Sequence, residues 1–441
     1  MAKKVMIFGA GLVSKPMVDF LAGNGFDVTI GDIELAKAEN LAAAHKNVSA
    51  VAIDAGNDEL MDSLVAAHDL SVSLLPATMH PIVARLCIKH KKNMVTASYV
   101  SPQMAALDNA AKEAGIVIVN EIGVDPGIDH MSAMKVFDDV KDKGGKIVSF
   151  MSYCGGVPAL QNNTNPMGYK FSWAPKGVLI AAGNNAQYLK DGEIVKVPGA
   201  ELFSHYWLVD VPGAATFEAY PNRDSLSYID IYGLEDIKTM YRGTFRNISH
   251  CDTWFALGQL GFFKKDAEVF DNANVSVPEF IKTRMLGLTK DADLKYHLAK
   301  MLELKEASVV LKKFEWLGFF DKNYQVPCPK GAAIDVLTAI MLEKMSYEDG
   351  ELDLLIMHHE FIAEFGDRQQ RITSSMVDYG IPDGDTSMSR TVSLPAAIAV
   401  KMILENKIEQ KGVIRPIDRK VYLPVLKELE TMNIKMVERY Y

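Results

Sequence analysis

Three polar side chains at alternate positions have the types needed to bind a carboxylate. They are Arg242, Thr244 and Arg246, in the segment YRGTFR that also contains Phe245. Alternate residues of a β-strand point to the same face, and a guanidinium group can bind both oxygens of a carboxylate. Arg223 lies in a second polar segment, YPNRDS, shortly before them. The same spacing also fits a solvated strand face with cross-strand salt bridges, so the residues alone leave both interpretations open.

A second set of polar residues follows two short apolar segments in the first third of the chain. Ser98 and Tyr99 come after the segment 93–97, and Asp125 comes after the segment 116–120. Tyr99 could line a binding site or donate a hydrogen bond; alternatively, it is a surface aromatic with its hydroxyl group in solvent. Asp125 precedes a proline, which favours an extended backbone and fixes its direction. The alternative for Asp125 is a turn carboxylate that caps the helix after it.

Other reactive side chains lack supporting spacing. Cys154 precedes two glycines at the expected end of a strand, so it could border a site, although a buried thiol is the alternative. His130 is a possible acid–base group near the start of a helix. His358 and His359 are adjacent in an expected strand, and such neighbours face opposite ways. The four cysteines form no CxxC motif, so the sequence predicts neither a metal site nor a disulfide framework.

The first residues have the pattern of a dinucleotide-binding turn. An apolar segment at 5–8 is followed by Gly9 and Gly11, and the third small residue of the pattern is Ser14 rather than glycine. The first glycine permits a tight turn, and the second lets the backbone approach a pyrophosphate at the start of a helix. Asp32 ends the next strand, about 20 residues on, where a carboxylate accepts hydrogen bonds from a ribose 2′-hydroxyl and repels a 2′-phosphate. The pattern therefore favours NAD over NADP.

Apolar segments that alternate with helical ones predict how these residues are positioned. The segments are 5–8, 27–31, 47–53, 70–75, 93–97 and 116–120. Their alternation predicts an α/β fold with a doubly wound parallel sheet of the Rossmann type. The carboxyl ends of parallel strands face one crevice, so the residues that follow them should converge there. These residues are Gly9, Asp32, Asp54, Leu75, Ser98 and Asp125.

The remainder of the chain predicts a second, α+β domain with a mixed or antiparallel sheet. Strands are expected at 146–153, 169–173, 217–220, 239–246, 352–365 and 368–379, with an irregular loop at 155–167. The pair Asp191-Gly192 predicts a hairpin turn. The apolar period between 250 and 344 is mostly helical. A sheet that stops and then resumes indicates a helical insertion.

The composition is that of a globular protein. The chain has 441 residues and a net charge of −9, from 47 basic and 56 acidic residues, with no long basic segment. Nucleic acid is therefore not an expected partner. No segment approaches about 18 uninterrupted apolar residues, so no membrane span is expected. The start of the chain becomes a strand too soon for a signal peptide, which favours a cytoplasmic protein.

Longer motifs resemble the saccharopine dehydrogenase family of the glutamate-forming type. They are HPIVARLCIKHKKNMVTASYVSP at 80–102, NEIGVDPGIDHM at 120–131, SYCGGVPA at 152–159, NPMGYKFSWAPKGVL at 165–179, YPNRDSLSYIDIYG at 220–233, YRGTFR at 241–246 and SRTVSLPAAIAVKMIL at 389–404. The resemblance spans nearly the entire chain. Members of that family oxidise saccharopine with a nicotinamide cofactor and water, which gives glutamate and 2-aminoadipate 6-semialdehyde in lysine metabolism.

The resemblance implies site residues, domains and assembly. Cofactor contacts are implied at Gly9, Gly11, Leu12, Val13, Ser14, Asp32, Ile33, Asp54, Ala55, Leu75, Ser98, Val124, Asp125 and Pro126. Saccharopine contacts are implied at Ser98, Tyr99, Asp125, Arg223, Thr244, Phe245 and Arg246. Candidates for proton transfer are Asp125, Tyr99 and Cys154, and the open alternatives are a bound water or the substrate amine itself. The implied domains are 1–125 with 395–441 for the cofactor, 126–250 with 346–394 for the substrate and a homodimer interface, and 251–345 as the insertion.

Three alternatives remain for the function. An enzyme for the same reaction that prefers NADP is the first, although the segment Gly31-Asp32-Ile33-Glu34 lacks the basic or small hydroxyl residues of many NADP-using relatives. A relative of carboxynorspermidine dehydrogenase would act on a polyamine, whose positive charges the arginines would repel. A nucleotide-binding protein that has lost turnover would bind NADH and leave saccharopine unchanged.

Overall fold

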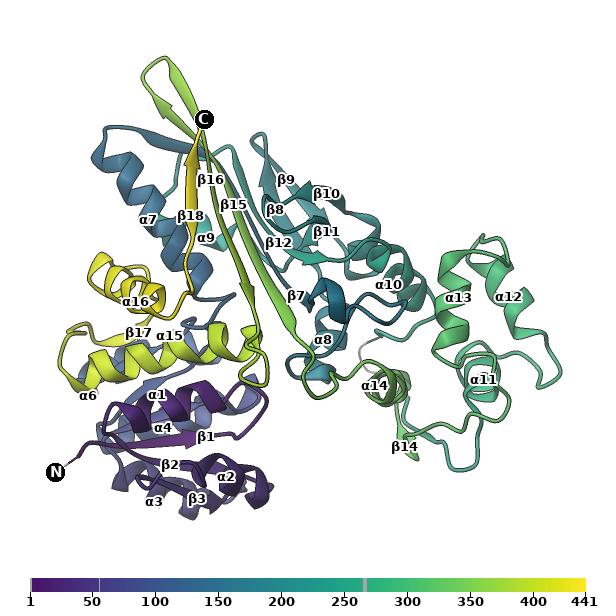
Figure 1. Cartoon of the computed structure of the whole chain (residues 1–441), viewed down its shortest axis with the longest axis horizontal. Helices are drawn as coiled ribbons and strands as arrows, with labels where there is room; N and C mark the ends of the chain where they lie inside the picture. The colour runs from purple at the N-terminus through teal and green to yellow at the C-terminus, as the bar shows by residue number, and fades with distance from the viewer. Residues whose placement is uncertain (1, 55, 265–267) are drawn as a thin grey trace. The chain divides into compact units, whose positions relative to one another are not determined.

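The computed structural model describes residues 2–54, 56–264 and 268–441, and the chain divides into two compact units (Figure 1). Unit 1 consists of Met1–Lys146, Glu364–Arg368 and Gly384–Arg439. Unit 2 consists of Ile147–Ala363, Gln369–Asp383 and Tyr440–Tyr441. Unit 1 has a parallel sheet and unit 2 a mixed sheet, so the predicted fold class is confirmed.

Unit 1 is built on a seven-stranded sheet whose neighbouring strands are all parallel. In sheet order the strands are β17 (Gly412–Ile414), β6 (Val117–Val119), β5 (Asn93–Val95), β4 (Leu70–Ser73), β1 (Lys4–Phe8), β2 (Asp27–Asp32) and β3 (Val48–Ala52). The order β3-β2-β1-β4-β5-β6 is that of a Rossmann fold. Residues 5–8 of the central strand are fully buried, which explains their continuous apolar character.

The seventh strand of this sheet comes from the C-terminal part of the chain. Gly412 of β17 pairs with Val117 of β6, and Ile414 pairs with Val119, in parallel register. A segment of this length has too few residues to show a period of its own. Only its pairing with β6 therefore identifies it as part of the Rossmann sheet.

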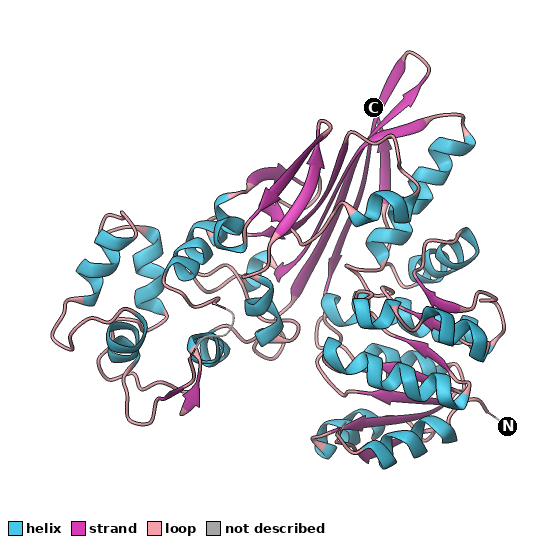
Figure 2. Ribbon diagram, turned by 180° about the vertical axis from the view of Figure 1, so that it is seen from behind, coloured by secondary structure: helices cyan, strands magenta, loops and turns pink. Residues whose placement is uncertain are grey.

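The helices of unit 1 alternate with its strands along the chain, and two of them come from the C-terminal segment. Figure 2 shows helices beside the strands of the parallel sheet. The helices are α1 (Lys15–Gly23), α2 (Leu35–Ala42), α3 (Asp58–Ala67), η1 (Ala77–Met79), α4 (His80–His90), α5 (Pro102–Ala105), α6 (Asp108–Ala114), α7 (Ile128–Asp142), α15 (Ser387–Leu404) and α16 (Arg419–Thr431). Ser101 caps α5, as the sequence predicts, because its side chain accepts a hydrogen bond from the backbone N–H of Met104 at 3.2 Å. Helix α15 packs against α1, and α16 packs against α7.

Unit 2 contains most of the strands of a nine-stranded mixed sheet. Its main order is β10 (Trp207–Asp210), β11 (Thr216–Pro221), β12 (Thr239–Arg246), β7 (Lys146–Pro158), β15 (Asp353–Phe365), β16 (Arg368–Tyr379) and β18 (Val437–Tyr440). The hairpin of β8 (Ala186–Lys190) and β9 (Glu193–Val197) joins it through β12. Asp191 and Gly192 form the turn of this hairpin with φ of 51° and 87°, so the predicted hairpin is confirmed.

The remaining elements of unit 2 are mostly helical between residues 250 and 344, as predicted. They are η2 (Leu160–Asn162), α8 (Pro175–Ala181), η3 (Gly199–Ser204), α9 (Ser227–Tyr232), α10 (His250–Gln259), β13 (Phe270–Asp271), α11 (Val277–Glu279), η4 (Phe280–Met285), α12 (Leu294–Met301), α13 (Val309–Trp316), β14 (Lys330–Gly331) and α14 (Ala333–Lys344). One hydrophobic core joins these helices to the sheet, with large buried residues such as Tyr153, Tyr241 and Trp254. Burial of this core fixes the position of β12, which carries the arginines.

Two local predictions for unit 2 are wrong. β7 continues through Gly155 to Pro158 where a loop was expected, because Gly155 allows a close approach: an added Cβ would lie 2.4 Å from the carbonyl oxygen of Phe245. The segment 169–173 is not a strand. Its backbone makes single hydrogen bonds to non-strand partners, such as the 2.9 Å bond from Phe171 N to the carbonyl of Met345.

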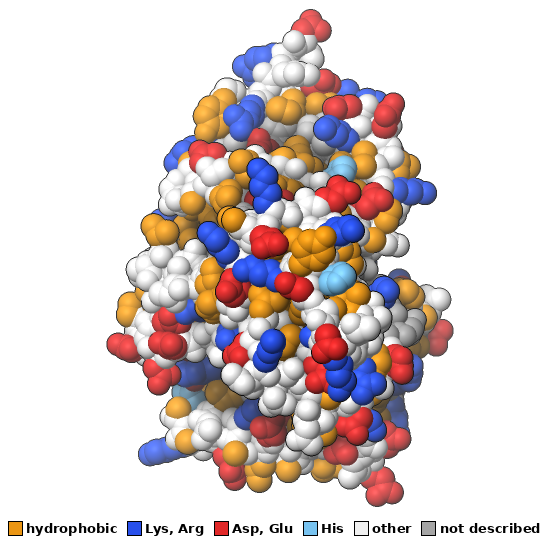
Figure 3. Space-filling view, turned by 90° about the vertical axis from the view of Figure 1, so that its right-hand side faces the viewer, with side chains coloured by type: hydrophobic (Ala, Val, Ile, Leu, Met, Phe, Trp, Pro, Cys, Tyr) orange, Lys and Arg blue, Asp and Glu red, His pale blue; other side chains and the backbone are white. Residues whose placement is uncertain are grey.

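No described helix is long and apolar enough to cross a membrane. On the face drawn in Figure 3, basic and acidic side chains are interspersed with small groups of hydrophobic ones. This face therefore carries no extended field of one sign.

Candidate functional site

The glycine turn of unit 1 leaves space beside its backbone. Gly9 has a φ of 109°, which other residues rarely adopt, and an added Cβ would lie 3.1 Å from the backbone of Leu74. A Cβ at Gly11 would meet no described atom within 4 Å. The hydroxyl group of Ser14 donates a hydrogen bond to the carbonyl of Gly9 at 3.0 Å, and α1 begins at the next residue. The turn therefore fits a pyrophosphate that faces the start of a helix.

Asp32 lies at the end of β2, beside this turn. Its Oδ2 accepts a hydrogen bond from the N–H of Ala10 at 2.8 Å, and its Oδ1 accepts one from the N–H of Glu34 at 3.0 Å. A carboxylate has about four acceptor positions, so these two bonds leave capacity for a ribose hydroxyl. Leu12 and Ile33 are 64% and 74% exposed and offer apolar contact to a planar base. These residues fit the adenosine half of a dinucleotide.

Three other expected cofactor residues are less informative. The Asp54 side chain makes a hydrogen bond within its own turn, since its Oδ1 accepts from the N–H of Gly56 at 2.9 Å. Ala55 lies outside the described residues. Leu75 follows β4 and packs, partly buried, against the core of unit 1.

A buried histidine joins Ser98 to the end of β4. The Nε2 atom of His80 lies 2.7 Å from the hydroxyl oxygen of Ser98, and its Nδ1 lies 2.8 Å from that of Ser73. Burial lowers the pKa of the His80 imidazole to about 4, so it is neutral near pH 7. His80 therefore holds the Ser98 hydroxyl by a neutral hydrogen bond. Sequence reasoning missed this role, although the position of His80 at a helix start after a strand was recognisable.

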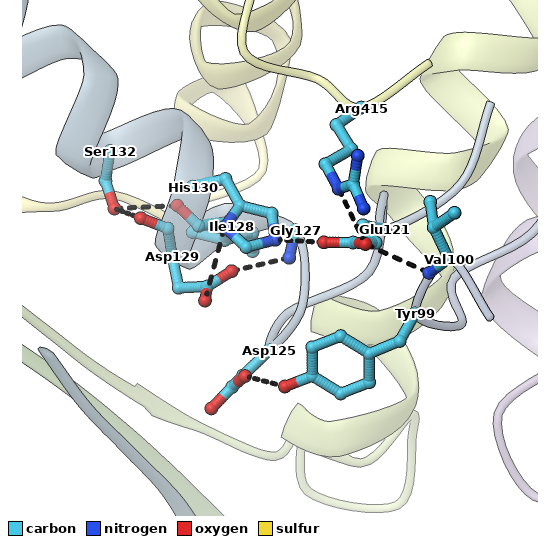
Figure 4. A network of polar contacts seen from close by, with 10 residues as sticks. All are labelled: Tyr99, Val100, Glu121, Asp125, Gly127, Ile128, Asp129, His130, Ser132 and Arg415. Atoms are coloured by element: carbon cyan, nitrogen blue, oxygen red, sulfur yellow. Dashed lines mark hydrogen bonds and ion pairs between the residues drawn. The ribbon is translucent and has the colours of Figure 1, made fainter. Parts of the chain in front are cut away.

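Tyr99 and Asp125, which are 26 residues apart in sequence, are hydrogen-bonded to each other (Figure 4). The phenol oxygen of Tyr99 donates to Oδ1 of Asp125 at 2.8 Å. The alternative considered for Tyr99, a hydroxyl group in solvent, is therefore wrong. The residue directly before α7 is Gly127, and this position has no side-chain capping hydrogen bond.

A buried carboxylate, Glu121, is drawn close to Tyr99 in the same view (Figure 4). It accepts hydrogen bonds from the N–H of Val100 and from Nε of Arg415 on Oε1, and its Oε2 lies 2.9 Å from Nε2 of His130. Burial would raise the pKa of Glu121, but the hydrogen bond from His130 and the charges of His130 and Arg415 outweigh it and lower the pKa to about 2. His130 is fully buried in this network, and nothing in the sequence singled out Glu121.

The arginines of β12 in unit 2 are buried, so the alternative of a solvated strand face is wrong. Arg242 is 3% exposed and Arg246 is 6% exposed. The guanidinium carbon of Arg242 lies 4.3 Å from the ring centre of Tyr228, and that of Arg246 lies 4.9 Å from the ring centre of Tyr169. A cation–π contact uses the face of the guanidinium group, so its N–H groups still need hydrogen-bond acceptors.

Arg246 has few such partners. One terminal nitrogen donates to the carbonyl of Phe245 at 2.8 Å, while Nε has no hydrogen-bond partner among the described residues. Glu218 is directly opposite on β11, but its carboxylate accepts hydrogen bonds from the N–H groups of Ser249 and Cys251, at 2.6 Å and 2.7 Å. Arg246 is therefore a buried cation without a carboxylate partner in the described part of the chain.

Two unpaired ring nitrogens lie in the same cluster. His250 stacks on Trp254 with ring centres 4.7 Å apart, and it contacts Tyr169 at 6.0 Å. Neither Nδ1 of His250 nor Nε1 of Trp254 has a hydrogen-bond partner in the described structure. Burial and the charge of Arg246 hold the pKa of His250 well below its usual range. Sequence reasoning missed His250, since only the fold brings it to Arg246.

The other expected substrate residues of unit 2 differ in exposure. Arg223 is exposed on the turn after β11, Thr244 is half-buried and Phe245 is fully buried. The expectation that Cys154 ends a strand is wrong, because β7 continues past it to Pro158. Cys154 is 7% exposed and pairs with Thr244 in the sheet.

Unit 1 thus brings together the glycine turn, Asp32, Ser98, Tyr99 and Asp125 at strand ends, and unit 2 brings Thr244 and Arg246 together on one strand. Among the described residues, no group of three or more His, Cys, Asp or Glu could hold a metal ion.

Two family models cover most of the chain. Residues 5–119 match the saccharopine dehydrogenase NADP binding domain, and residues 123–434 match the saccharopine dehydrogenase C-terminal domain. The first contains the glycine turn and the second contains β12.

Proteins of known name match over the same extent. The chain is 38% identical to saccharopine dehydrogenase [NADP(+), L-glutamate-forming] of Pyricularia oryzae, over 97% of this chain and 96% of that protein. It is 38% identical to the protein of that name from Saccharomyces cerevisiae, over 98% and 97%. The apo structure of the histidine-tagged yeast saccharopine dehydrogenase (L-Glu forming) superposes with a TM-score of 0.88 at 36% identity and covers 100% of both chains. The chain therefore belongs to the saccharopine dehydrogenase family of oxidoreductases.

Proposed function

We propose that the chain oxidises saccharopine with a nicotinamide cofactor and water, and releases glutamate and 2-aminoadipate 6-semialdehyde. The observation that carries this proposal is the guanidinium group of Arg246, which is buried and has no carboxylate partner among the described residues. A buried charge left unpaired is costly, so such a site favours an anionic ligand. Saccharopine has three carboxylates. A polyamine substrate would instead place like charges together.

The chemistry of this reaction assigns roles to the pair in unit 1. Oxidation takes a hydride from the carbon beside the secondary nitrogen, and that nitrogen must first lose its proton. The resulting C=N bond adds water and collapses to the amine of glutamate and the aldehyde. We assign Asp125 to accept the hydrogen bond, and then the proton, of the secondary amine. Tyr99 orients the Asp125 carboxylate through its 2.8 Å hydrogen bond.

For the remaining site residues, we propose the roles that the family resemblance implies. A bound nicotinamide supplies the hydride acceptor, and the turn at Gly9 to Ser14 with Asp32 fits the dinucleotide that carries it. Val124 and Pro126 flank the proposed proton acceptor, while Ser98 is held by His80. Cys154 is the weakest candidate for proton transfer, because its thiol is buried within β7.

The cofactor preference is a separate part of the proposal. The relatives named above are NADP(+) enzymes, and the matching family model is described as NADP binding. Asp32 supports NAD for this chain, since its carboxylate lies at the position where a 2′-phosphate would meet a negative charge. We therefore propose that NAD is preferred and NADP is accepted poorly.

Assembly and location complete the proposal. We propose a cytoplasmic homodimer with the domains expected from the sequence: 1–125 with 395–441, 126–250 with 346–394, and 251–345. The family resemblance, which implies a dimer interface on the mixed-sheet domain, supports this part of the proposal. Light scattering of the purified chain would give the mass of a dimer, and a monomeric mass would refute this part.

A direct assay tests the activity. The purified chain is incubated with saccharopine and either NAD or NADP, and reduced nicotinamide and glutamate are measured together. The proposal requires both products in equal amounts. Binding of NADH without any oxidation of saccharopine would refute it and would indicate the nucleotide-binding alternative.

A further inference from the structure

Glu121 connects three segments of unit 1 that are far apart in the sequence. Its carboxylate is 1% exposed, and its Oε1 accepts hydrogen bonds from Val100 N at 2.9 Å and from Nε of Arg415 at 2.8 Å. Its Oε2 accepts a hydrogen bond from Nε2 of His130 at 2.9 Å, because an ionised carboxylate can only accept. The backbone N–H of Glu121 donates to the carbonyl of Ser98 at 3.0 Å. Four hydrogen bonds thus converge on one buried residue.

These bonds hold the proposed reactive pair from both sides (Figure 4). Tyr99 lies between Ser98 and Val100, and both of these neighbours are bonded to Glu121. On the other side, His130 is in the first turn of α7, directly after the loop that carries Asp125.

Asp129, the neighbour of His130, fixes the end of the loop that carries Asp125. The Oδ1 atom of Asp129 accepts a hydrogen bond from the N–H of Gly127 at 2.6 Å, and its Oδ2 lies 3.6 Å from Nδ1 of His130. The loop is therefore tied to the residue that contacts Glu121. Displacement of the Glu121 carboxylate would move both partners of the Tyr99–Asp125 hydrogen bond.

Arg415 brings the C-terminal segment into this network. It follows β17, the strand that completes the sheet, and its Nε contacts the Glu121 carboxylate. A buried carboxylate that loses a charged partner pays a desolvation penalty, so it would shift toward other donors or water. Arg415 thus stabilises the position of Glu121 and not only its charge.

We propose that Glu121 is a positioning residue for the reaction, which holds Tyr99 and Asp125 in their productive geometry, and that Arg415 restrains Glu121 from the C-terminal segment. This inference rests on the proposed roles of Tyr99 and Asp125. A displacement of about 1 Å in a positioned group can cost about 100-fold in rate. Loss of the network should therefore reduce turnover more than it reduces binding.

The test uses the full chain with two variants of the network and one matched control. Glu121→Gln removes the charge at constant size, and Arg415→Met removes the partner. Arg419→Met is the control, since Arg419 forms a surface ion pair with Asp142 at 2.8 Å that leads to no proposed site residue. We expect kcat for saccharopine oxidation to fall about 10- to 100-fold in the first two variants and to be unchanged in the control. The Kd of NADH, measured by fluorescence, should change less than kcat does in the first two variants, because most of the implied cofactor contacts lie at the glycine turn and at Asp32, whose hydrogen bonds given above do not involve Glu121.

Rescue by a conservative variant separates positioning from simple destabilisation. Arg415→Lys retains the charge and should recover part of the kcat lost in Arg415→Met. If Glu121→Gln does not fold, the Arg415 variants test the inference instead. The Arg415 side chain is 26% exposed, so its replacement disturbs the core less. Unchanged kcat in Arg415→Met, with or without a lower Tm, would overturn the inference.

The variant Asp125→Asn, measured in parallel, distinguishes this failure from that of the proposed function. Normal turnover in Asp125→Asn would refute the role proposed for Asp125 itself, and with it the basis of the inference. Loss of turnover in Asp125→Asn together with normal turnover in Arg415→Met would refute the positioning network alone.

Discussion

The hydroxyl group of Tyr99 donates a hydrogen bond to Oδ1 of Asp125 at 2.8 Å. The two residues lie on loops that follow β5 and β6, which are neighbouring parallel strands. A phenol that donates to one oxygen of a carboxylate fixes the direction of that carboxylate. In the function proposed above, this hydrogen bond sets the direction in which Asp125 meets the substrate amine.

Removal of the Tyr99 hydroxyl group should slow turnover. We expect Tyr99→Phe to lower kcat for saccharopine oxidation about 10-fold, and Asp125→Asn to lower it at least about 100-fold, the lower end of the usual contribution of acid–base groups. Steady-state kinetics of both variants would measure these losses in kcat. Tyr206→Phe is the matched control, because that residue forms a surface hydrogen bond with Asp252 at 3.2 Å. A smaller loss in Asp125→Asn than in Tyr99→Phe would contradict the assigned roles.

Replacement of Arg246 should weaken binding without loss of stability. In Arg246→Met the KM for saccharopine should rise about 100-fold or more, because a charge-assisted contact to a carboxylate is lost. The free energy of unfolding should stay equal or increase, since a buried guanidinium without a carboxylate partner is replaced by an apolar side chain. Arg371→Met, at the exposed ion pair with Glu360, serves as control for both measurements. An unchanged KM with a large loss of stability would show that Arg246 is structural.

The charge of Asp32 should control the choice of cofactor. Asp32→Asn retains a side-chain oxygen for the N–H of Ala10 and removes the negative charge, whereas Asp32→Ala removes both. We expect the ratio of kcat/KM for NAD to that for NADP to fall about 10-fold or more in both variants, which is about 1.4 kcal/mol. Asp27→Asn, at the opposite end of β2, should retain the original ratio. Unchanged selectivity in Asp32→Asn would remove the electrostatic explanation.

His80 should make the folded chain less stable as the pH falls. Its pKa is about 4 in the folded chain, through burial, against 6.5 for an exposed imidazole. Above pH 6.5 both states are neutral, whereas between pH 6.5 and 4 only the unfolded chain binds the proton. The free energy of unfolding therefore decreases over this range, by up to about 3 kcal/mol from this residue. Urea unfolding at several pH values should show a shallower decrease for His80→Gln, and an identical decrease would refute the low pKa.

Local sequence patterns were sufficient for the dinucleotide turn and for much of the fold. Gly9, Ser14 and Asp32 act within one βαβ unit, so their spacing already contains the geometry of the turn. The polar residues Ser98 and Asp125 could be placed at one crevice because parallel strands align their carboxyl ends. The predictions failed at 155–158 and 169–173, where close contact with another segment, rather than local period, decides the backbone conformation.

By itself, the sequence determined the Rossmann sheet, the glycine turn with its acidic partner, and the family motifs that contain the site residues. Only the tertiary structure decided which of these residues are charged, buried or paired. Arg415 reaches Glu121 across 294 positions of the chain, and Arg246 loses its opposite carboxylate to the backbone of α10. The physical reason is that burial and pairing depend on segments brought together by the whole fold, whereas residue spacing reports only what neighbouring residues can form.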